Sequence, residues 1–225
     1  MTAKEILSKT DHTLLRPDAT WQQIQTVLDE GMAFGTASVC LPPCFVKEAV
    51  SYVTGALPVC TVIGFPNGYA TTASKCFEAE DAVKNGAAEI DMVIQIGLLK
   101  EGKDEALLKQ INAVRQSCGT SLLKVIVETC MLTEEEKVRV CRVVDDSDAE
   151  YIKTSTGFAG SGAAIEDIIL WKSMICHGTK IKAAGGIRTL ADAGAFLAAG
   201  ASRIGASALV SEARAAEMKN PSAAR

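Results

Sequence analysis

Short runs of apolar and β-branched residues alternate along this chain with longer stretches that have the 3.6-residue period of helices. This alternation is typical of a parallel sheet whose strands are joined by covering helices. Eight such runs can be counted. They lie at approximately Asp11–Leu15, Ala37–Cys40, Val59–Phe65, Glu89–Ile94, Leu122–Glu128, Tyr151–Thr154, Lys180–Ala183 and Ser202–Gly205.

Helix-like segments occupy most of the intervals between these runs. Capping signals support several of them, because Thr133 stands three residues before Glu136 and because Gly86 and Gly200 follow the last periodic residues. The expected helices are approximately Trp21–Phe34, Thr72–Asn85, Asp104–Ser117, Thr133–Asp145, Ala163–Ile175 and Leu190–Ala199.

The length of the repeating unit selects among α/β folds. Eight units in 225 residues leave about 28 residues per unit, which suits a compact TIM (β/α)8 barrel. An open doubly wound sheet competes, but the first strand is not followed by GxGxxG and no GxxxxGK[ST] loop occurs. We therefore predict a TIM barrel that forms a single domain over residues 1–225, with disorder at the extreme C-terminus from about 217.

Composition limits the kinds of partner. A net charge of −4, a pI near 5.3 and no basic cluster with interleaved aromatic residues predict no nucleic-acid partner. The charged N-terminus and the lack of a long apolar run predict no membrane partner and a cytoplasmic location. Eight dispersed cysteines without a CxxC pair predict reduced, mostly buried thiols, and only two histidines predict no metal.

Three charged residues interrupt strand-like sequence. Asp91, Lys153 and Lys182 lie in the fourth, sixth and seventh runs, and their separations of 62 and 29 residues match about two units and one unit of the repeat. We expect them at equivalent heights, converging in the mouth of the barrel. The alternative for each is a strand-end charge that faces solvent. Lys124, on the fifth run, is either a further ion-pair partner or a substrate contact.

Two lysines in one barrel mouth favour imine chemistry. An amine attacks an aldehyde only while unprotonated, whereas a free lysine has a pKa near ~10.4. Burial and a facing Lys182 would both disfavour the charged form of Lys153 and so activate it. Asp91 would keep Lys182 charged and share in proton transfer, directly or through a water molecule.

Glycine-rich sequence follows two of the last strands. Loops after strands seven and eight are where barrels bind phosphate through backbone N–H groups. Taken singly, such glycines only make tight turns. Together they favour a phosphorylated small-molecule substrate, and the predicted contacts are Gly157, Gly185, Gly186, Arg188, Gly205 and Ser207.

Five segments together resemble the deoxyribose-phosphate aldolase family, and the resemblance covers nearly the whole chain. They are Asp11-His12-Thr13-Leu14-Leu15, Glu89-Ile90-Asp91-Met92-Val93-Ile94, Leu123-Lys124-Val125-Ile126-Val127-Glu128-Thr129, Lys153-Thr154-Ser155-Thr156-Gly157-Phe158 and Lys182-Ala183-Ala184-Gly185-Gly186-Ile187-Arg188. The resemblance implies a TIM barrel and a reversible cleavage of 2-deoxyribose 5-phosphate to glyceraldehyde 3-phosphate and acetaldehyde, without metal or organic cofactor.

The resemblance also implies residue roles. The lysine matching Lys153 forms the imine, and those residues matching Lys182 and Asp91 relay protons. Asp11 and Thr13 match positions near the relay and the substrate hydroxyls, with Lys124 beneath them. The chain departs from the family where Gln95 replaces a frequent Asn, where Ala184 replaces a frequent Ser, and in its tail, because the last tyrosine is Tyr151.

Two other functions stay open at this point. Another phosphosugar aldolase or isomerase would share the glycine loops but need a different acid and base. A catalytically silent phosphosugar-binding barrel would need no pair of facing lysines. A barrel of this size is also expected to self-associate as a dimer or tetramer through its outer helices.

Overall fold

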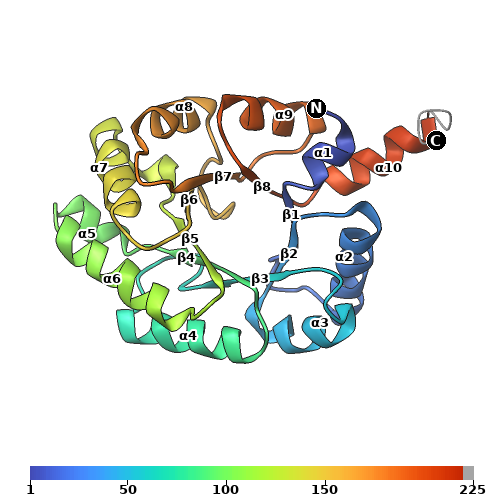
Figure 1. Cartoon of the computed structure of the whole chain (residues 1–225), viewed down its shortest axis with the longest axis horizontal. Coiled ribbons are helices and arrows are strands. Elements are labelled where there is room, and N and C mark those ends of the chain that lie inside the picture. Colours follow the sequence, from blue (N-terminus) through green and yellow to red (C-terminus); the bar gives the residue numbers. More distant parts are fainter. Residues whose placement is uncertain (220–225) are drawn as a thin grey trace.

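The eight strands pair in parallel in their order along the chain, and pairing of the first with the last closes them into a barrel (Figure 1). The computed structural model describes residues 1–219. The predicted TIM barrel is confirmed. Its strands are β1 (Thr10–Thr13), β2 (Ser38–Leu41), β3 (Val59–Ile63), β4 (Glu89–Val93), β5 (Leu122–Ile126), β6 (Tyr151–Lys153), β7 (Lys180–Ala184) and β8 (Arg203–Ala206).

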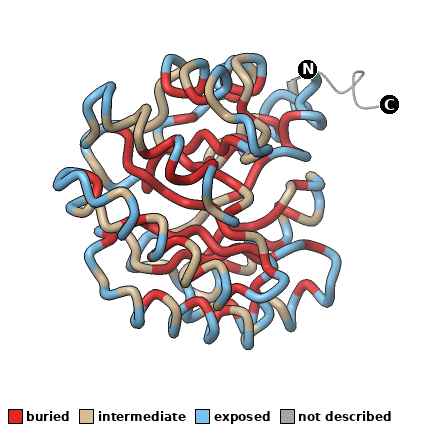
Figure 2. Tube along the Cα trace, turned by 60° about the vertical axis from the view of Figure 1, so that its left-hand side comes forward, coloured by how far each residue is buried: buried red, intermediate tan, exposed pale blue. Residues whose placement is uncertain are grey.

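Helices form a ring outside the barrel, and the most deeply buried backbone lies in the strands at its centre (Figures 1 and 2). The α-helices are α1 (Ala3–Leu7), α2 (Trp21–Phe34), α3 (Val46–Val53), α4 (Thr72–Lys84), α5 (Ile96–Lys100), α6 (Asp104–Ser117), α7 (Glu134–Asp145), α8 (Ile165–Met174), α9 (Leu190–Ala199) and α10 (Leu209–Lys219). Two short 3-10 helices are η1 (Pro43–Phe45) and η2 (Thr129–Met131). No helix in residues 1–219 is long and apolar enough to cross a bilayer.

Boundaries differ from the prediction mainly at strand ends. The third run was expected to reach Phe65, but β3 stops at Ile63 because Gly64 adopts φ 56°. The fifth was expected to reach Glu128, but β5 stops at Ile126, and Glu128 itself is left-handed. Of the stretch predicted to be disordered from about 217, residues 217–219 continue α10, and the rest lies outside the described residues.

Buried apolar side chains fill the space between the strands and the helices, as parallel sheets covered on both sides require. Four of the eight cysteines are buried, and none forms a disulfide. Trp171 of α8 is fully buried and donates its indole N–H to the carbonyl of Lys137 on α7 at 3.2 Å. This hydrogen bond joins α7 to α8 in the outer ring of helices.

Lys75 is an unexpected charge in this outer layer. It lies on α4, is fully buried, and donates to the carbonyl of Val93 at 2.8 Å and to Oε1 of Gln110 at 3.0 Å. Both acceptors are uncharged. The ammonium therefore ties α4 and α6 to the carboxyl end of β4, the strand that carries Asp91.

Burial lowers the pKa of Lys75 to about 8 from its ordinary 10.5, with the carboxylate of Glu78 acting in the opposite direction. Between these two values the unfolded chain binds more protons than the folded one, so this lysine makes stability rise with pH. Relative to Lys75→Met, the wild-type free energy of unfolding should gain up to roughly 3 kcal/mol from pH 8 to pH 10.5. Urea unfolding at both pH values measures this, and a constant difference between the two proteins would contradict it.

Candidate active site

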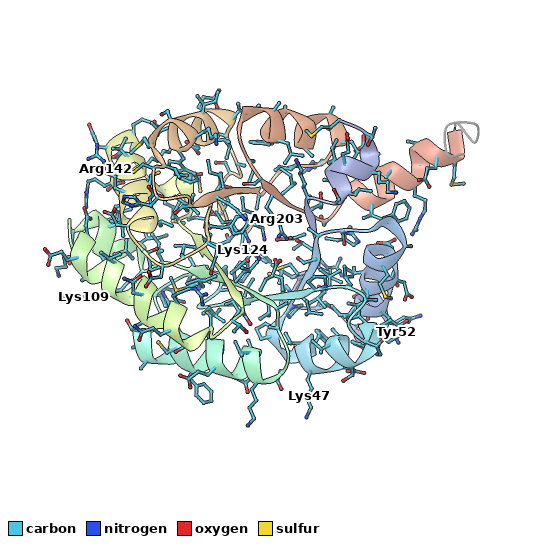
Figure 3. All side chains as sticks on the ribbon, viewed as in Figure 1. Lys47, Tyr52, Lys109, Lys124, Arg142 and Arg203 are labelled. Carbon is cyan, nitrogen blue, oxygen red and sulfur yellow. The ribbon has the colours of Figure 1, made fainter. Side chains whose placement is uncertain are left out.

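Seven charged side chains from six strands meet inside the barrel, and we call them the barrel charge cluster. Its least buried member, Arg203, has a side chain only 12% exposed. Figure 3 shows Arg203 and Lys124 within the barrel, whereas Lys109 and Arg142 point outward from helices. The cluster consists of Asp11 from β1, Glu89 and Asp91 from β4, Lys124 from β5, Lys153 from β6, Lys182 from β7 and Arg203 from β8.

The strand register decides which members meet. Lys153 and Lys182 are direct partners across β6 and β7. Asp91 is instead the partner of Lys124, and Lys124 is the partner of Tyr151. Lys153 therefore stands two residues nearer the carboxyl end than this second row, so the expected equal height is wrong in register. The stagger of tilted strands in a closed barrel still brings these side chains into contact.

The carboxylate of Asp91 is the centre of the cluster. Its Oδ2 lies 2.7 Å from Nζ of Lys153 and 2.7 Å from Nζ of Lys182, and its Oδ1 lies 2.8 Å from Nζ of Lys124. Burial alone would raise the pKa of Asp91, but these three ammonium groups outweigh it and hold the pKa well below its ordinary value. Asp91 is therefore ionised over the whole working range of pH.

Lys182 is held from two sides. Its Nζ contacts Oδ2 of Asp11 at 2.5 Å in addition to Asp91. Burial disfavours its charge, but the two carboxylates prevail and raise the pKa of Lys182. Arg203 holds the other oxygen of Asp11 at 2.5 Å, and the pKa of Asp11 is lowered because the cations around it outweigh its burial. Lys182 is thus a fixed, permanently charged neighbour of Lys153.

Lys124 lies deeper in the barrel. It is fully buried, and its Nζ contacts Glu89 at 2.7 Å as well as Asp91. Burial opposes its charge, yet the carboxylates of Asp91, Asp11 and Glu89 and the Cys60 thiol raise the pKa of Lys124. Of the two alternatives left by the sequence, the structure places Lys124 in the ion pair.

Lys153 differs from the other cations of the cluster. Among the described residues, Asp91 is the one carboxylate within ion-pair distance of its ammonium group, and the same oxygen also holds Lys182. Lys153 also lines a cavity at the carboxyl end of the strands, which its partners Asp91 and Lys182 do not. It is the member of the cluster that a ligand in this cavity can reach.

The cavity has a volume of about 350 Å³. It brings together Thr13 from β1 and all six residues predicted to contact phosphate. Its other lining residues, which were not among the predicted contacts, lie at the ends of β7 and β8 and in the loops after β1, β6 and β7. They are Leu14, Leu15, Arg16, Thr156, Phe158, Ala184, Ile187 and Ala206.

The glycine loops leave backbone open toward the cavity. Gly185 and Gly186 have φ values of 89° and 76°, which glycine adopts without strain. An added Cβ at Gly205 would approach Cε of Lys182 at 3.2 Å, so a small residue there also lets Lys182 pack behind the cavity wall. The side chain of Arg188 and the start of α10, just after Ser207, add positive potential.

Thiol and carboxylate ligands also lie within the barrel. They form two sets of three residues that share Cys60, and within each set the possible ligand atoms lie within 4.8 Å of one another. One set is Cys40, Cys60 and Asp91, and the other is Asp11, Cys60 and Glu89. Their carboxylates already hold the ammonium groups of the cluster, whose positive charge opposes a bound cation. A third set, outside the cavity, is Asp145, Cys176 and His177.

A family model described as DeoC/LacD family aldolase matches residues 6–211. The chain belongs to this family. Deoxyribose-phosphate aldolases from Streptococcus pyogenes serotype M4 and Streptococcus agalactiae serotype Ia are each 53% identical to it over 210 residues, 93% of this chain and 94% of theirs. A solved deoxyribose phosphate aldolase from Aeropyrum pernix, titled a unique tetrameric structure, has a TM-score of 0.89 and 27% identity, covering 98% of this chain and 93% of that one. The predicted family resemblance is confirmed.

In this aldolase, Asp91 should be critical for stability as well as for the site. Asp91→Asn leaves three buried ammonium groups without their shared carboxylate, which should lower the free energy of unfolding by about 3–5 kcal/mol. Asp18→Asn is the matched control, because Asp18 pairs with Arg16 on the surface, where both side chains are more than half exposed. Urea unfolding compares the two, and equal losses would contradict the central position of Asp91.

Proposed function

We propose that this aldolase cleaves 2-deoxy-D-ribose 5-phosphate reversibly into D-glyceraldehyde 3-phosphate and acetaldehyde through an imine on Lys153. One observation carries the proposal: Lys153 shares its cavity with Gly185 and Gly186 after β7 and with the end of β8 around Gly205. An amine and an anion-binding wall in one cavity suit an aldehyde that carries a phosphate. The names of the streptococcal relatives agree with this substrate.

In the proposed reaction, the neutral amine of Lys153 adds to the aldehyde carbon of the open-chain sugar, and water leaves to form a protonated imine. The positive nitrogen then draws electrons from the bond between C2 and C3, which breaks as the C3 hydroxyl gives up its proton. Glyceraldehyde 3-phosphate departs. The remaining enamine takes a proton at C2, and water releases acetaldehyde from Lys153.

Asp91 and Lys182 would act from behind Lys153. The Asp91 carboxylate, 2.7 Å from the Lys153 nitrogen, stabilises the protonated imine. Lys182 shares that oxygen and is already protonated, so a proton can move only from Lys182 through Asp91 toward Lys153, after which Lys182 can take one back. Since neither partner lines the cavity, a water molecule would carry protons from them to the substrate.

We also propose a cytoplasmic enzyme that self-associates as a dimer or tetramer. Tyr69 and Phe77, just before and on α4, are 78% and 70% exposed. Contact between copies through such residues would remove apolar surface from water. The cytoplasm would keep exposed thiols such as Cys44 and Cys176 reduced.

Turnover of the sugar phosphate tests the proposed function, and Gly186→Val tests the phosphate site. The purified wild-type protein should release acetaldehyde and glyceraldehyde 3-phosphate in equal amounts. Gly186→Val should raise KM for 2-deoxyribose 5-phosphate more than for 2-deoxyribose, because a side chain would block backbone donors. Steady-state kinetics with both sugars measure this.

Gly178→Val is the matched control for Gly186→Val. Gly178 has φ 98° and, like Gly186, has open space around an added Cβ, but it does not line the cavity. It should therefore carry the backbone strain without the selective change in KM. Equal losses on both sugars in Gly186→Val would refute the phosphate site, and no cleavage by the wild type would refute the function itself.

A further inference from the structure

Glu128 has an unusual backbone for its residue type. It follows β5 by two positions and adopts φ 56° and ψ 67°, a left-handed conformation that costs free energy in a residue with a Cβ atom. It is also 2% exposed, which is rare for a glutamate without a partner that holds it. A strained and buried carboxylate at the carboxyl end of a barrel strand points to a function.

The Glu128 side chain is held mainly by Thr156, with one further, weak contact from the Cys130 thiol to its Oε1 at 4.0 Å. Its Oε2 accepts the hydroxyl proton of Thr156 in a short hydrogen bond, and both of its oxygens lie 3.3 Å from the backbone nitrogen of Thr156. Thr156 lies on the loop after β6, three residues beyond Lys153. The contact therefore joins the ends of β5 and β6 beside the proposed imine position.

Thr156 in turn lines the cavity with Lys153. A threonine hydroxyl has one proton to donate and two lone pairs that accept. Glu128 takes the proton, and the backbone N–H of Phe158 occupies one lone pair at 3.0 Å. One lone pair stays available, so the hydroxyl of Thr156 can only accept from a ligand.

We propose that Glu128 is a positioning residue that fixes Thr156 as a hydrogen-bond acceptor and thereby selects aldehydes carrying a hydroxyl group. The inference rests on the proposed function and narrows its substrate class. A sugar hydroxyl can donate to Thr156, whereas a carbonyl, an ether or a deoxygenated carbon at the same place cannot. The left-handed backbone of Glu128 aims the carboxylate at Thr156 from the neighbouring strand.

Glu128→Gln keeps the size of the side chain and replaces one of its two acceptor oxygens by an NH2 donor. Both oxygens of Glu128 face the backbone N–H of Thr156. The glutamine amide can be placed in two orientations, and in each of them its NH2 group faces this N–H donor. If the amide nitrogen replaces Oε2, it also forces the Thr156 hydroxyl to turn its proton away. Thr156→Val removes the hydroxyl at nearly constant volume, and Thr156→Ser retains it.

Two reactions on the same Lys153 separate positioning from general structure. Cleavage of 2-deoxyribose 5-phosphate uses a hydroxylated substrate, whereas borohydride trapping of acetaldehyde uses one without a hydroxyl. Glu128→Gln and Thr156→Val should each lower kcat/KM for cleavage by roughly 10- to 100-fold, the loss expected for one hydrogen bond to a buried group. Both should trap acetaldehyde at the wild-type rate, and Thr156→Ser should restore most of the cleavage.

The double variant Glu128→Gln with Thr156→Val should lose little more than either single variant, since one acts through the other. Additive losses, or equal loss of acetaldehyde trapping, would show that Glu128 only supports the barrel end and would overturn the proposal. Wild-type cleavage in Glu128→Gln would overturn it as well. Failure of the wild type to cleave the sugar phosphate would instead refute the proposed function.

Discussion

The ion pairs of Asp91 are the interaction on which the rest of this structure depends. One buried carboxylate holds ammonium groups from β5, β6 and β7 within 2.8 Å. Charges this deep are tolerated only when they are paired, so the closed barrel and its charge cluster need each other. Opening the sheet anywhere from β4 through β8 to β1 would separate groups that come from distant parts of the chain. The fold and the site therefore depend on the same contacts, and in the outer layer Lys75 ties α4 to the carboxyl end of β4, the strand that carries Asp91.

Charge balance distinguishes Lys153 within the cluster. Lys124, Lys182 and Arg203 each contact at least two carboxylates, whereas Lys153 contacts one oxygen that it shares. With every member ionised, four positive charges would face three negative ones. Conversion of Lys153 to an imine is then a change at the one cation of the cluster that lines the cavity, which is also the cation with the fewest carboxylate contacts. Asp91 can therefore stabilise the protonated imine on Lys153 while it keeps its ion pairs with Lys124 and Lys182.

Sequence periodicity was enough to predict the barrel and to bring Asp91, Lys153 and Lys182 together, because charges inside apolar strands have few other places to go. Three helices were placed to the residue, at Trp21–Phe34, Asp104–Ser117 and Leu190–Ala199. Other features were beyond its reach. Arg203 is the first residue of β8, and a charged residue at the start of a strand is usually predicted to face solvent. Lys75 is buried although it lies in a helix whose sequence is largely polar. The left-handed backbone of Glu128 could not be predicted from the sequence, because glutamate rarely adopts this conformation. The roles of the predicted site residues remain predictions.

Chemical trapping of the imine tests the central claim most directly, because it reads the reactive residue without depending on turnover. The protein is treated with acetaldehyde and borohydride, digested and mapped by mass spectrometry. A two-carbon adduct on Lys153, absent from Lys153→Ala and unaffected by prior treatment with a chelator, is the predicted result. An adduct on Lys182 or Lys124 would contradict the assignment of Lys153 as the member of the cluster that lines the cavity, and the absence of any adduct would contradict imine chemistry in this barrel.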